Sequence, residues 1–358
     1  MESVWQPSSE RAGHDHRPNP HRPHDPPRPG GWAIRGTGAY LPDRRVGSRE
    51  LSRSLGLDAS WIEDRTGIRN RHVAAPGEAA SDLAAAAAGR ALARAGVDAA
   101  DVGLIVLGTS TPDELGPSTA CRVQALLGAR GAAAFDVAAA CTGFLYALQA
   151  ALGWLAGRGE PAYALVVGVE VYSRFLNPAD RATSALFGDG AAAAVVGPVA
   201  APYGIGRITL GSDGSRAGDV LIPAGGSRAP AGPGTVAGHG HTIHMDARSV
   251  RAFIAEVFPR LVAEATEDAG VKPADLALVV PHQPNPRLVA SLAGQAGLEP
   301  EQLAIAGQDV GNIGAASLPY ALHQAVREDR IGAGDLVLLA GFGAGVTWGR
   351  ALVTWPPP

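Results

Sequence analysis

The 358-residue sequence is poor in cysteine, lysine and aromatic residues. Two cysteines, Cys121 and Cys141, are too few for a disulfide framework, and they suit a reducing compartment. Lys272 is the only lysine, so arginine carries nearly all of the positive charge. The formal net charge of −4 indicates no general attraction to nucleic acid or to an anionic membrane.

The sequence also lacks long apolar runs. No uninterrupted segment reaches the roughly 20 apolar residues of a membrane span, and the N-terminus has no apolar core of a signal peptide. We therefore expect a cytoplasmic protein that contacts neither membrane nor nucleic acid. Hydrophobic residues make up 46% and charged residues 18% of the chain, which favours a globular protein.

Residues 1–31 form a polar tail rich in proline, arginine and histidine. Such a composition buries too little apolar surface to order itself, so we predict a disordered segment. Its histidines could bind a metal, but a solvated tail is the stronger interpretation and we expect no metal site; they are His14, His16, His21 and His24.

From residue 32 onward, apolar runs alternate with helical segments, which is typical of an α/β fold. The stretch 91–106 aligns without a gap on 265–280, and both read as helix, glycine stop, turn and buried strand. We infer two similar halves, 32–200 and 201–358, packed face to face.

The pattern predicts strands and helices in the same order in each half. Expected strands are 31–42, 102–108, 132–137, 162–169, 191–196, 276–281, 336–340 and 345–353. Expected helices are 81–95, 117–127, 141–156, 250–269, 286–296 and 315–327.

Cys141 follows a predicted strand and three alanines and begins a predicted helix. The free N–H groups and the dipole at a helix start favour an anion, so a thiolate there should have a lowered pKa and act as a nucleophile. From spacing alone a buried, inert cysteine is the commoner outcome. Cys121 lies inside another helix, and we assign it to packing.

His282 ends an apolar strand in the second half, at the edge where α/β sheets place their sites. Asn312 precedes a helix, and its amide can donate a hydrogen bond without changing charge. Either residue alone could be structural. The glycine-rich segment 341–349 reads as a turn between strands whose N–H groups could stabilise an oxyanion.

The loop 223–240 is rich in glycine, proline and alanine. We interpret it as a passive surface excursion, with a flap over the substrate entrance as the alternative.

Taken together, these segments resemble the β-ketoacyl-acyl-carrier-protein synthase III family of the thiolase superfamily, from about residue 32 to 355. The motifs occur in the family's order: WIEDRTGIRNRH, DVAAACTGF, FGDGAAAAVV, LGSDGS, PHQPN, GNIGAAS and GFGAGVTWG. The resemblance implies a five-layered αβαβα fold, a homodimer, and acyl transfer from a thioester to Cys141 followed by decarboxylative Claisen condensation with a malonyl-type thioester.

The resemblance also implies roles for individual residues. His282 and Asn312 would hydrogen-bond the thioester oxygen of the malonyl unit, and the N–H groups of Cys141 and Ala344 would form the oxyanion hole. Substrate-binding positions would be Trp61, Arg65, Gly116, Phe144, Arg181 and Arg287. Acyl-coenzyme A or an acyl carrier protein would be the partner, with coenzyme A entering as a substrate thioester and no bound cofactor.

Several residues depart from the family pattern. Gly116 stands where relatives often carry a large residue that limits the acyl pocket, and Ile313 and Gly314 replace the usual Thr-Ser. Pro284 replaces a small residue, and Ala344 replaces a glycine. We take these changes to indicate a specialised pathway, such as polyketide or other secondary metabolism.

The principal alternative is an acyltransferase on the same scaffold, which would move the acyl group from Cys141 to a hydroxyl or amine. Asn312 favours condensation, because such acyltransferases often have it altered, whereas its changed neighbours keep the alternative open. A silent carrier-binding subunit is disfavoured by the intact Cys, His and Asn set. A thiolase proper would need a second reactive cysteine near 341–345.

Overall fold

The computed structural model describes residues 31–158 and 162–358. The predicted tail, with its four histidines, therefore lies outside the described residues apart from its last position.

The first sheet has the strand order β1-β7-β6-β4-β5. At its centre β4 (Val102–Gly108) pairs in parallel with β5 (Ala133–Val137) and with β6 (Tyr163–Val171). β7 (Asp189–Val199) runs antiparallel to β6 and to β1 (Gly31–Tyr40). β4 and β6 are covered on both faces, which explains why they read as continuous apolar runs.

The second sheet repeats this arrangement in the order β8-β13-β12-β11. β11 (Leu278–Pro281) and β12 (Leu336–Gly343) are parallel, and β13 (Thr347–Thr354) and β8 (Gly204–Ser212) follow antiparallel. Where the first sheet has β5, the second has only an isolated bridge between Val279 and Leu303.

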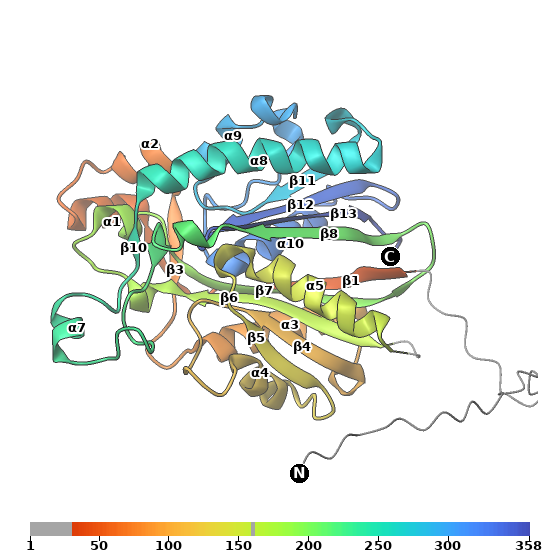
Figure 1. Cartoon of the computed structure of the whole chain (residues 1–358), viewed down its shortest axis with the longest axis horizontal. Coiled ribbons are helices and arrows are strands. Elements are labelled where there is room, and N and C mark those ends of the chain that lie inside the picture. Colours follow the sequence, from red (N-terminus) through yellow and green to blue (C-terminus); the bar gives the residue numbers. More distant parts are fainter. Residues whose placement is uncertain (1–30, 159–161) are drawn as a thin grey trace, which may run out of the picture.

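Helices cover both sheets and fill the space between them (Figure 1). α3 (Ala80–Ala95) and α4 (Thr119–Leu127) lie on the outer face of the first sheet. α5 (Gly143–Ala156) and α10 (Ser317–Arg327) form the central layer, and α8 (Ala247–Ala269) covers the second sheet. The predicted five-layered αβαβα fold is therefore confirmed.

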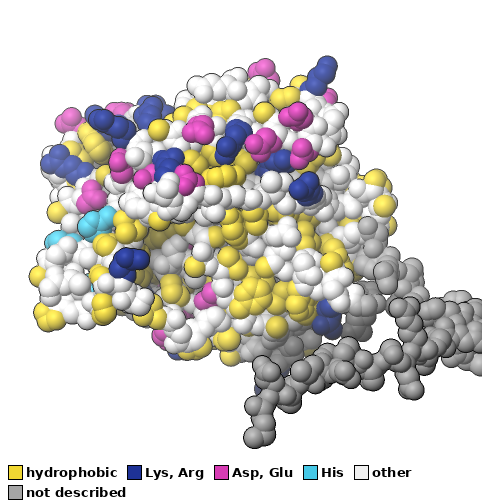
Figure 2. Space-filling view, viewed as in Figure 1, with side chains coloured by type: hydrophobic (Ala, Val, Ile, Leu, Met, Phe, Trp, Pro, Cys, Tyr) yellow, Lys and Arg dark blue, Asp and Glu magenta, His cyan; other side chains and the backbone are white. Residues whose placement is uncertain are grey.

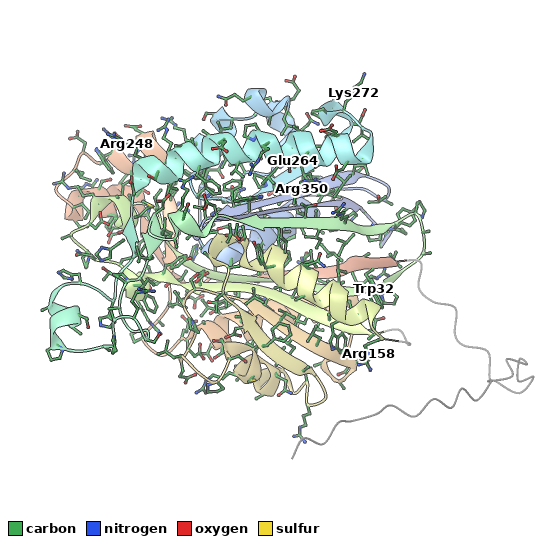
Figure 3. All side chains as sticks on the ribbon, in the orientation of Figure 1. Trp32, Arg158, Arg248, Glu264, Lys272 and Arg350 are labelled. Carbon is green, nitrogen blue, oxygen red and sulfur yellow. The ribbon has the colours of Figure 1, made fainter. Side chains whose placement is uncertain are left out.

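Two contacts show how closely the layers pack. A Cβ atom on Gly38 of β1 would lie 2.3 Å from the Ala87 carbonyl oxygen, so only glycine lets α3 approach this strand. On the other side Arg350 of β13 reaches α8, where its guanidinium lies 3.5 Å from Glu264 and 2.7 Å from Asp268 (Figure 3).

The predicted helices and strands agree with the structure to within a few residues, whereas β8 and several short elements were not predicted. α8 begins three residues before the predicted start, because the Asp246 side chain caps the N–H groups of Arg248 and Ser249. Besides β8, the unpredicted elements are α1 (Ser48–Ser54), α2 (Trp61–Thr66), α6 (Arg181–Ser184), α7 (Pro233–Ala237), β2 (Arg44–Gly47), β3 (Asn70–Val73), β9 (Val220–Leu221) and β10 (His244–Met245). The predicted helix 286–296 divides into α9 (Pro286–Ser291) and a 3-10 turn (Gly294–Ala296).

The loop 223–240 connects β9 to β10 and contains α7, which projects from the body of the molecule (Figure 1). Because β9 and β10 pair with each other, the loop returns to the body beside its point of departure. Over the described residues, no helix has both the length and the apolar character needed to cross a membrane.

Candidate active site

A cavity of about 580 Å³ lies between the two halves of the molecule. Cys141 from the first half, and His282 and Asn312 from the second, all line it. Three exposed arginines, Arg65, Arg251 and Arg287, line the same cavity and mark its open end. The duplicated fold thus brings the three predicted catalytic side chains, far apart in sequence, into one chamber.

Cys141 lies in a 3-10 turn, η2 (Ala140–Thr142), directly before α5. Ala140 has φ of 46°, a left-handed conformation that costs energy for any residue with a side chain. Thr142 fixes the turn by donating its hydroxyl to the Ala139 carbonyl at 2.6 Å. The predicted strand, elbow and helix are present, and the sulfur faces the cavity at the helix start.

The predicted lowering of the Cys141 pKa is wrong. The pKa of this thiol is raised to about 12, chiefly by burial and then by the nearby carboxylate of Glu170, while an interaction with Tyr172 opposes both effects. Removal of the sulfur from water therefore outweighs the helix start. Near pH 7 the side chain is therefore a thiol, which would have to lose its proton in any nucleophilic attack.

His282 follows β11 and is 1% exposed. Its backbone N–H donates to Ala340 O at 2.8 Å, and its ring packs edge-on against Phe342. Nδ1 is buried and has no hydrogen-bond partner among the described residues, and burial lowers the pKa of the imidazole to about 3. The ring is therefore neutral near pH 7, able to donate through one nitrogen and to accept through the other.

Asn312 precedes the turn η8 (Gly314–Ala316). Its backbone N–H donates to Leu186 O at 2.8 Å, which ties it to the first half. Its side-chain Oδ1 accepts from the Gly314 N–H at 2.9 Å. With the oxygen occupied in this way, Nδ2 is the atom left to donate into the cavity.

Sequence reasoning missed two buried groups beside the nucleophile. Tyr172 lines the cavity, and Glu170, which is fully buried two residues earlier, interacts with it. Burial raises the pKa of Glu170 to about 8. The signal was present in β6, because a single acid interrupts the apolar run YALVVGVEV.

The predicted substrate-binding residues divide into two groups. Arg65 and Arg287 line the cavity, as does Ala344, which was predicted for the oxyanion hole. Trp61 lies at the same end, with the Arg65 guanidinium 4.5 Å from its ring centroid. The remaining positions, Gly116, Phe144 and Arg181, do not line it; Phe144 is fully buried in the core, and Gly116 and Arg181 lie at the surface.

Two further predictions concern segments outside this chamber. Cys121 was assigned to packing, but it is exposed on α4, because it lies on the helix face that looks away from the core. Its sulfur lies 3.2 Å from the Ser118 hydroxyl. None of residues 223–240 lines the cavity, so the passive interpretation of that loop describes the geometry better than the flap.

Comparison with known proteins shows the family of the chain. Residues 135–214 match the family model for 3-oxoacyl-[acyl-carrier-protein (ACP)] synthase III, and residues 266–355 match the model for its C-terminal part. The beta-ketoacyl-[acyl-carrier-protein] synthase III of Rhodospirillum centenum is 45% identical over 326 residues, covering 90% of this chain and 98% of the relative. The chain belongs to the 3-oxoacyl-[acyl-carrier-protein] synthase III family. It is accordingly an enzyme of the condensing acyltransferase class.

The chain is also similar to other curated proteins and solved structures. An acetoacetyl CoA synthase from a Streptomyces species is 44% identical over 326 residues, covering 90% of this chain and 98% of the relative. The crystal structure of the synthase III from Aquifex aeolicus superposes with a TM-score of 0.83 at 36% identity, covering 91% of this chain and all of that one. The priming β-ketosynthase of a polyketide pathway has a TM-score of 0.84 at 34% identity, covering 93% and 98% of the two chains.

Proposed function

We propose that Cys141 takes the acyl group from an acyl thioester and that His282 and Asn312 direct a decarboxylative condensation onto it. The observation that carries this proposal is the convergence of the three side chains on one cavity. In the first step the Cys141 sulfur bonds the acyl carbon and the thioester C–S bond breaks. The thiol proton leaves with the departing thiol, and neutral His282 can accept and return it.

In the second step a malonyl-type thioester occupies the vacated cavity. Loss of carbon dioxide leaves an enolate whose negative charge develops on the thioester oxygen. The imidazole N–H of His282 and Nδ2 of Asn312 are the donors placed to stabilise that charge. The enolate carbon then bonds the acyl carbon, and the Cys141 sulfur leaves as a thiolate that takes up one proton from solvent. The N–H groups of Cys141 and Ala344 serve the oxyanion at the acyl carbonyl.

The arginines at the open end suit a phosphate-bearing carrier. Arg65 and Arg287 line the entrance and Trp61 offers an aromatic face beside them, a combination that fits coenzyme A or the phosphopantetheine arm of a carrier protein. We assign a more distant contact with the carrier to Arg181, which is exposed. Coenzyme A acts here as a substrate thioester, and the reaction needs no bound cofactor.

We place the enzyme in a specialised pathway in the cytoplasm, where unpaired cysteines such as Cys121 and Cys141 persist. Gly116 is exposed outside the cavity of this chain, so the small residue there does not by itself enlarge the acyl pocket. Relatives that include an acetoacetyl CoA synthase and a polyketide priming ketosynthase support a role outside housekeeping fatty-acid initiation.

We further propose a homodimer formed through β5. This strand is the edge of the first sheet, and Phe135 on it is 40% exposed. Leu126 on α4 and Leu115, which is 89% exposed, lie on the neighbouring segments. Hydrophobic side chains gather over the face that carries α4, α5 and β5, whereas charged ones gather over α8 (Figure 2). An exposed apolar edge strand is a template for pairing with a second copy.

Intact-mass spectrometry tests the first step. We expect one acyl adduct from a panel of acyl-coenzyme A thioesters, lost in Cys141→Ala and kept in the matched control Cys121→Ala. Addition of malonyl-carrier protein should then release carbon dioxide and a β-ketoacyl product. Transfer to an alcohol or amine without carbon dioxide would select the acyltransferase alternative, and failure of every thioester to acylate Cys141 would refute the proposal.

A further inference from the structure

Glu170 is an acid buried at the base of the catalytic chamber. It is 0% exposed and, besides its interaction with Tyr172, accepts hydrogen bonds from three groups on neighbouring segments. These are the Ser110 N–H at 3.1 Å, the Thr111 hydroxyl at 2.9 Å and the Ala315 N–H at 3.4 Å. In the described residues no cation pairs with it, and its raised pKa of about 8 reflects burial. Near pH 7 the carboxyl group is therefore largely protonated and can donate a hydrogen bond.

Tyr172 fills the space between this acid and the cavity. A Cβ atom on Gly314 would lie 2.6 Å from the Tyr172 hydroxyl and 2.6 Å from Cγ of Glu170. Both groups thus converge on the point that any other side chain at position 314 would occupy. The departure from the family's usual serine at this position has a physical reason here, because the Tyr172 hydroxyl and the acid take its place.

The same hydroxyl faces the nucleophile. Tyr172 and Cys141 line the same cavity, and Tyr172 is only 5% exposed, so its ring is held by packing, with Phe187 4.8 Å away between ring centroids. Its interaction with the sulfur favours the thiolate, whereas the Glu170 carboxylate disfavours it. Tyr172 therefore lies between the Cys141 sulfur and Glu170, and the carboxyl group of Glu170 can either assist or oppose ionisation of the thiol.

We propose that Tyr172 is a positioning residue for the nucleophile, which accepts a hydrogen bond from the protonated Glu170 and donates its own hydroxyl proton to the Cys141 sulfur. A tyrosine hydroxyl has one proton to donate. When Glu170 loses its proton, the carboxylate competes for that donor and also repels the thiolate. The side chain of Glu170 thus sets how readily the sulfur ionises.

The groups that face Glu170 come from four segments. They are Ser110 and Thr111 after β4, Cys141 in η2, Tyr172 after β6, and Ala315 in η8. Of these, Cys141 and Tyr172 titrate, and burial raises the pKa of both. Neither of these two groups ionises in the pH range where Glu170 does. The charge that changes beside the Cys141 sulfur in that range is therefore the charge of Glu170.

Alkylation of Cys141 by iodoacetamide tests the inference without a substrate. The rate is followed by peptide mass spectrometry from about pH 6 to 9, with exposed Cys121 as an internal reference. We expect Tyr172→Phe to slow alkylation of Cys141 about tenfold near pH 7, since one hydrogen bond to a thiolate is lost. Glu170→Gln should instead speed it up near pH 9, because no carboxylate forms. Tyr146→Phe is the matched control, since Tyr146 donates to Gly211 O outside the cavity.

Slower alkylation in Tyr172→Phe together with faster alkylation in Glu170→Gln would support the inference, because structural damage would change both rates in the same direction. A Tyr172→Phe profile that superposes on the wild type would overturn it, as would equal shifts in the same direction. If Tyr172→Phe does not fold by circular dichroism, Glu170→Gln alone decides, and an unchanged rate near pH 9 refutes the inference. The inference rests on Cys141 as the nucleophile, but alkylation needs no acyl donor. If both variants change the alkylation rate as expected but no thioester acylates Cys141, the proposed function is rejected and this inference still holds.

Discussion

A Cβ atom built on Gly343 would lie 2.9 Å from the Cys141 backbone nitrogen and 3.0 Å from its Cβ atom. The end of β12 therefore supports the nucleophile's turn directly, and neither backbone can move without displacing the other. This contact joins the two halves of the molecule at the reacting sulfur.

Gly343→Ala is accordingly expected to slow acylation of Cys141 at least about tenfold, because a displacement of the sulfur raises the barrier to attack. Single-turnover acylation followed by intact mass measures this rate. Gly341→Ala is the matched control, since its Cβ atom would meet the end of the Leu145 side chain at 2.8 Å rather than backbone. Equal rates for the two variants would contradict the expectation.

Asn312→Ala is expected to lower the condensation rate about 10²–10³-fold while acylation of Cys141 falls much less. The reason is that its Nδ2 group serves the enolate oxygen, and one such donor contributes about that factor. Carbon dioxide release and acyl-adduct formation measure the two steps separately. Asn312→Asp, which keeps Oδ1 but not the donor, should show the same selective loss. Equal loss of both steps would refute the role assigned to Asn312.

His282 is expected to make stability depend on pH. Its pKa is about 3 in the folded protein and 6.5 in its ordinary state, so the unfolded chain binds the extra proton. The contribution to stability is complete above about pH 6.5 and is lost as the pH falls toward 3. Between pH 7 and 5 the wild type should lose about 2 kcal/mol more than His282→Gln in urea unfolding. The exposed His244→Gln should follow the wild type, and identical losses in all three proteins would exclude this linkage.

Phe135→Arg is expected to convert the proposed dimer into a monomer, because it places a charge on the apolar edge strand β5. Sedimentation velocity or size-exclusion chromatography with light scattering measures the mass. Val236→Arg makes the same change at an exposed apolar residue on α7 and should leave the mass unchanged. A dimer that survives Phe135→Arg would place the interface elsewhere.

The sequence predicted the long elements because their signals are local. The strand 102–108 is a buried apolar run, and α3 begins and ends at its expected residues to within one position. The turn at Cys141 was equally visible, because small residues separate a strand from a helix. Convergence on one cavity followed from the repeat between the two halves rather than from any single motif.

The remaining features depend on contacts between distant segments. The pKa of Cys141 is raised by burial and by Glu170, which lies 29 positions away and acts through the folded structure alone. The exposure of Cys121 depends on which face of α4 meets the sheet, and nine residues of helix do not fix that face. The position of Tyr172 could not be predicted from local sequence, because it depends on the close approach of Gly314 from the other half of the chain.

The isolated bridge at Leu303 bears on how many chains can assemble. The Ala304 N–H donates to Val279 O at 2.9 Å, so a passing segment occupies the free side of β11. Over residues 31–158 and 162–358, the corresponding margin of the first sheet, formed by β5, pairs with no further strand. When two copies associate about a two-fold axis through β5, the β5 margin of each chain is covered by that of the other. The unequal duplication therefore fits the proposed dimer, in which each chain contributes its β5 margin and the β11 side of the second sheet takes no part.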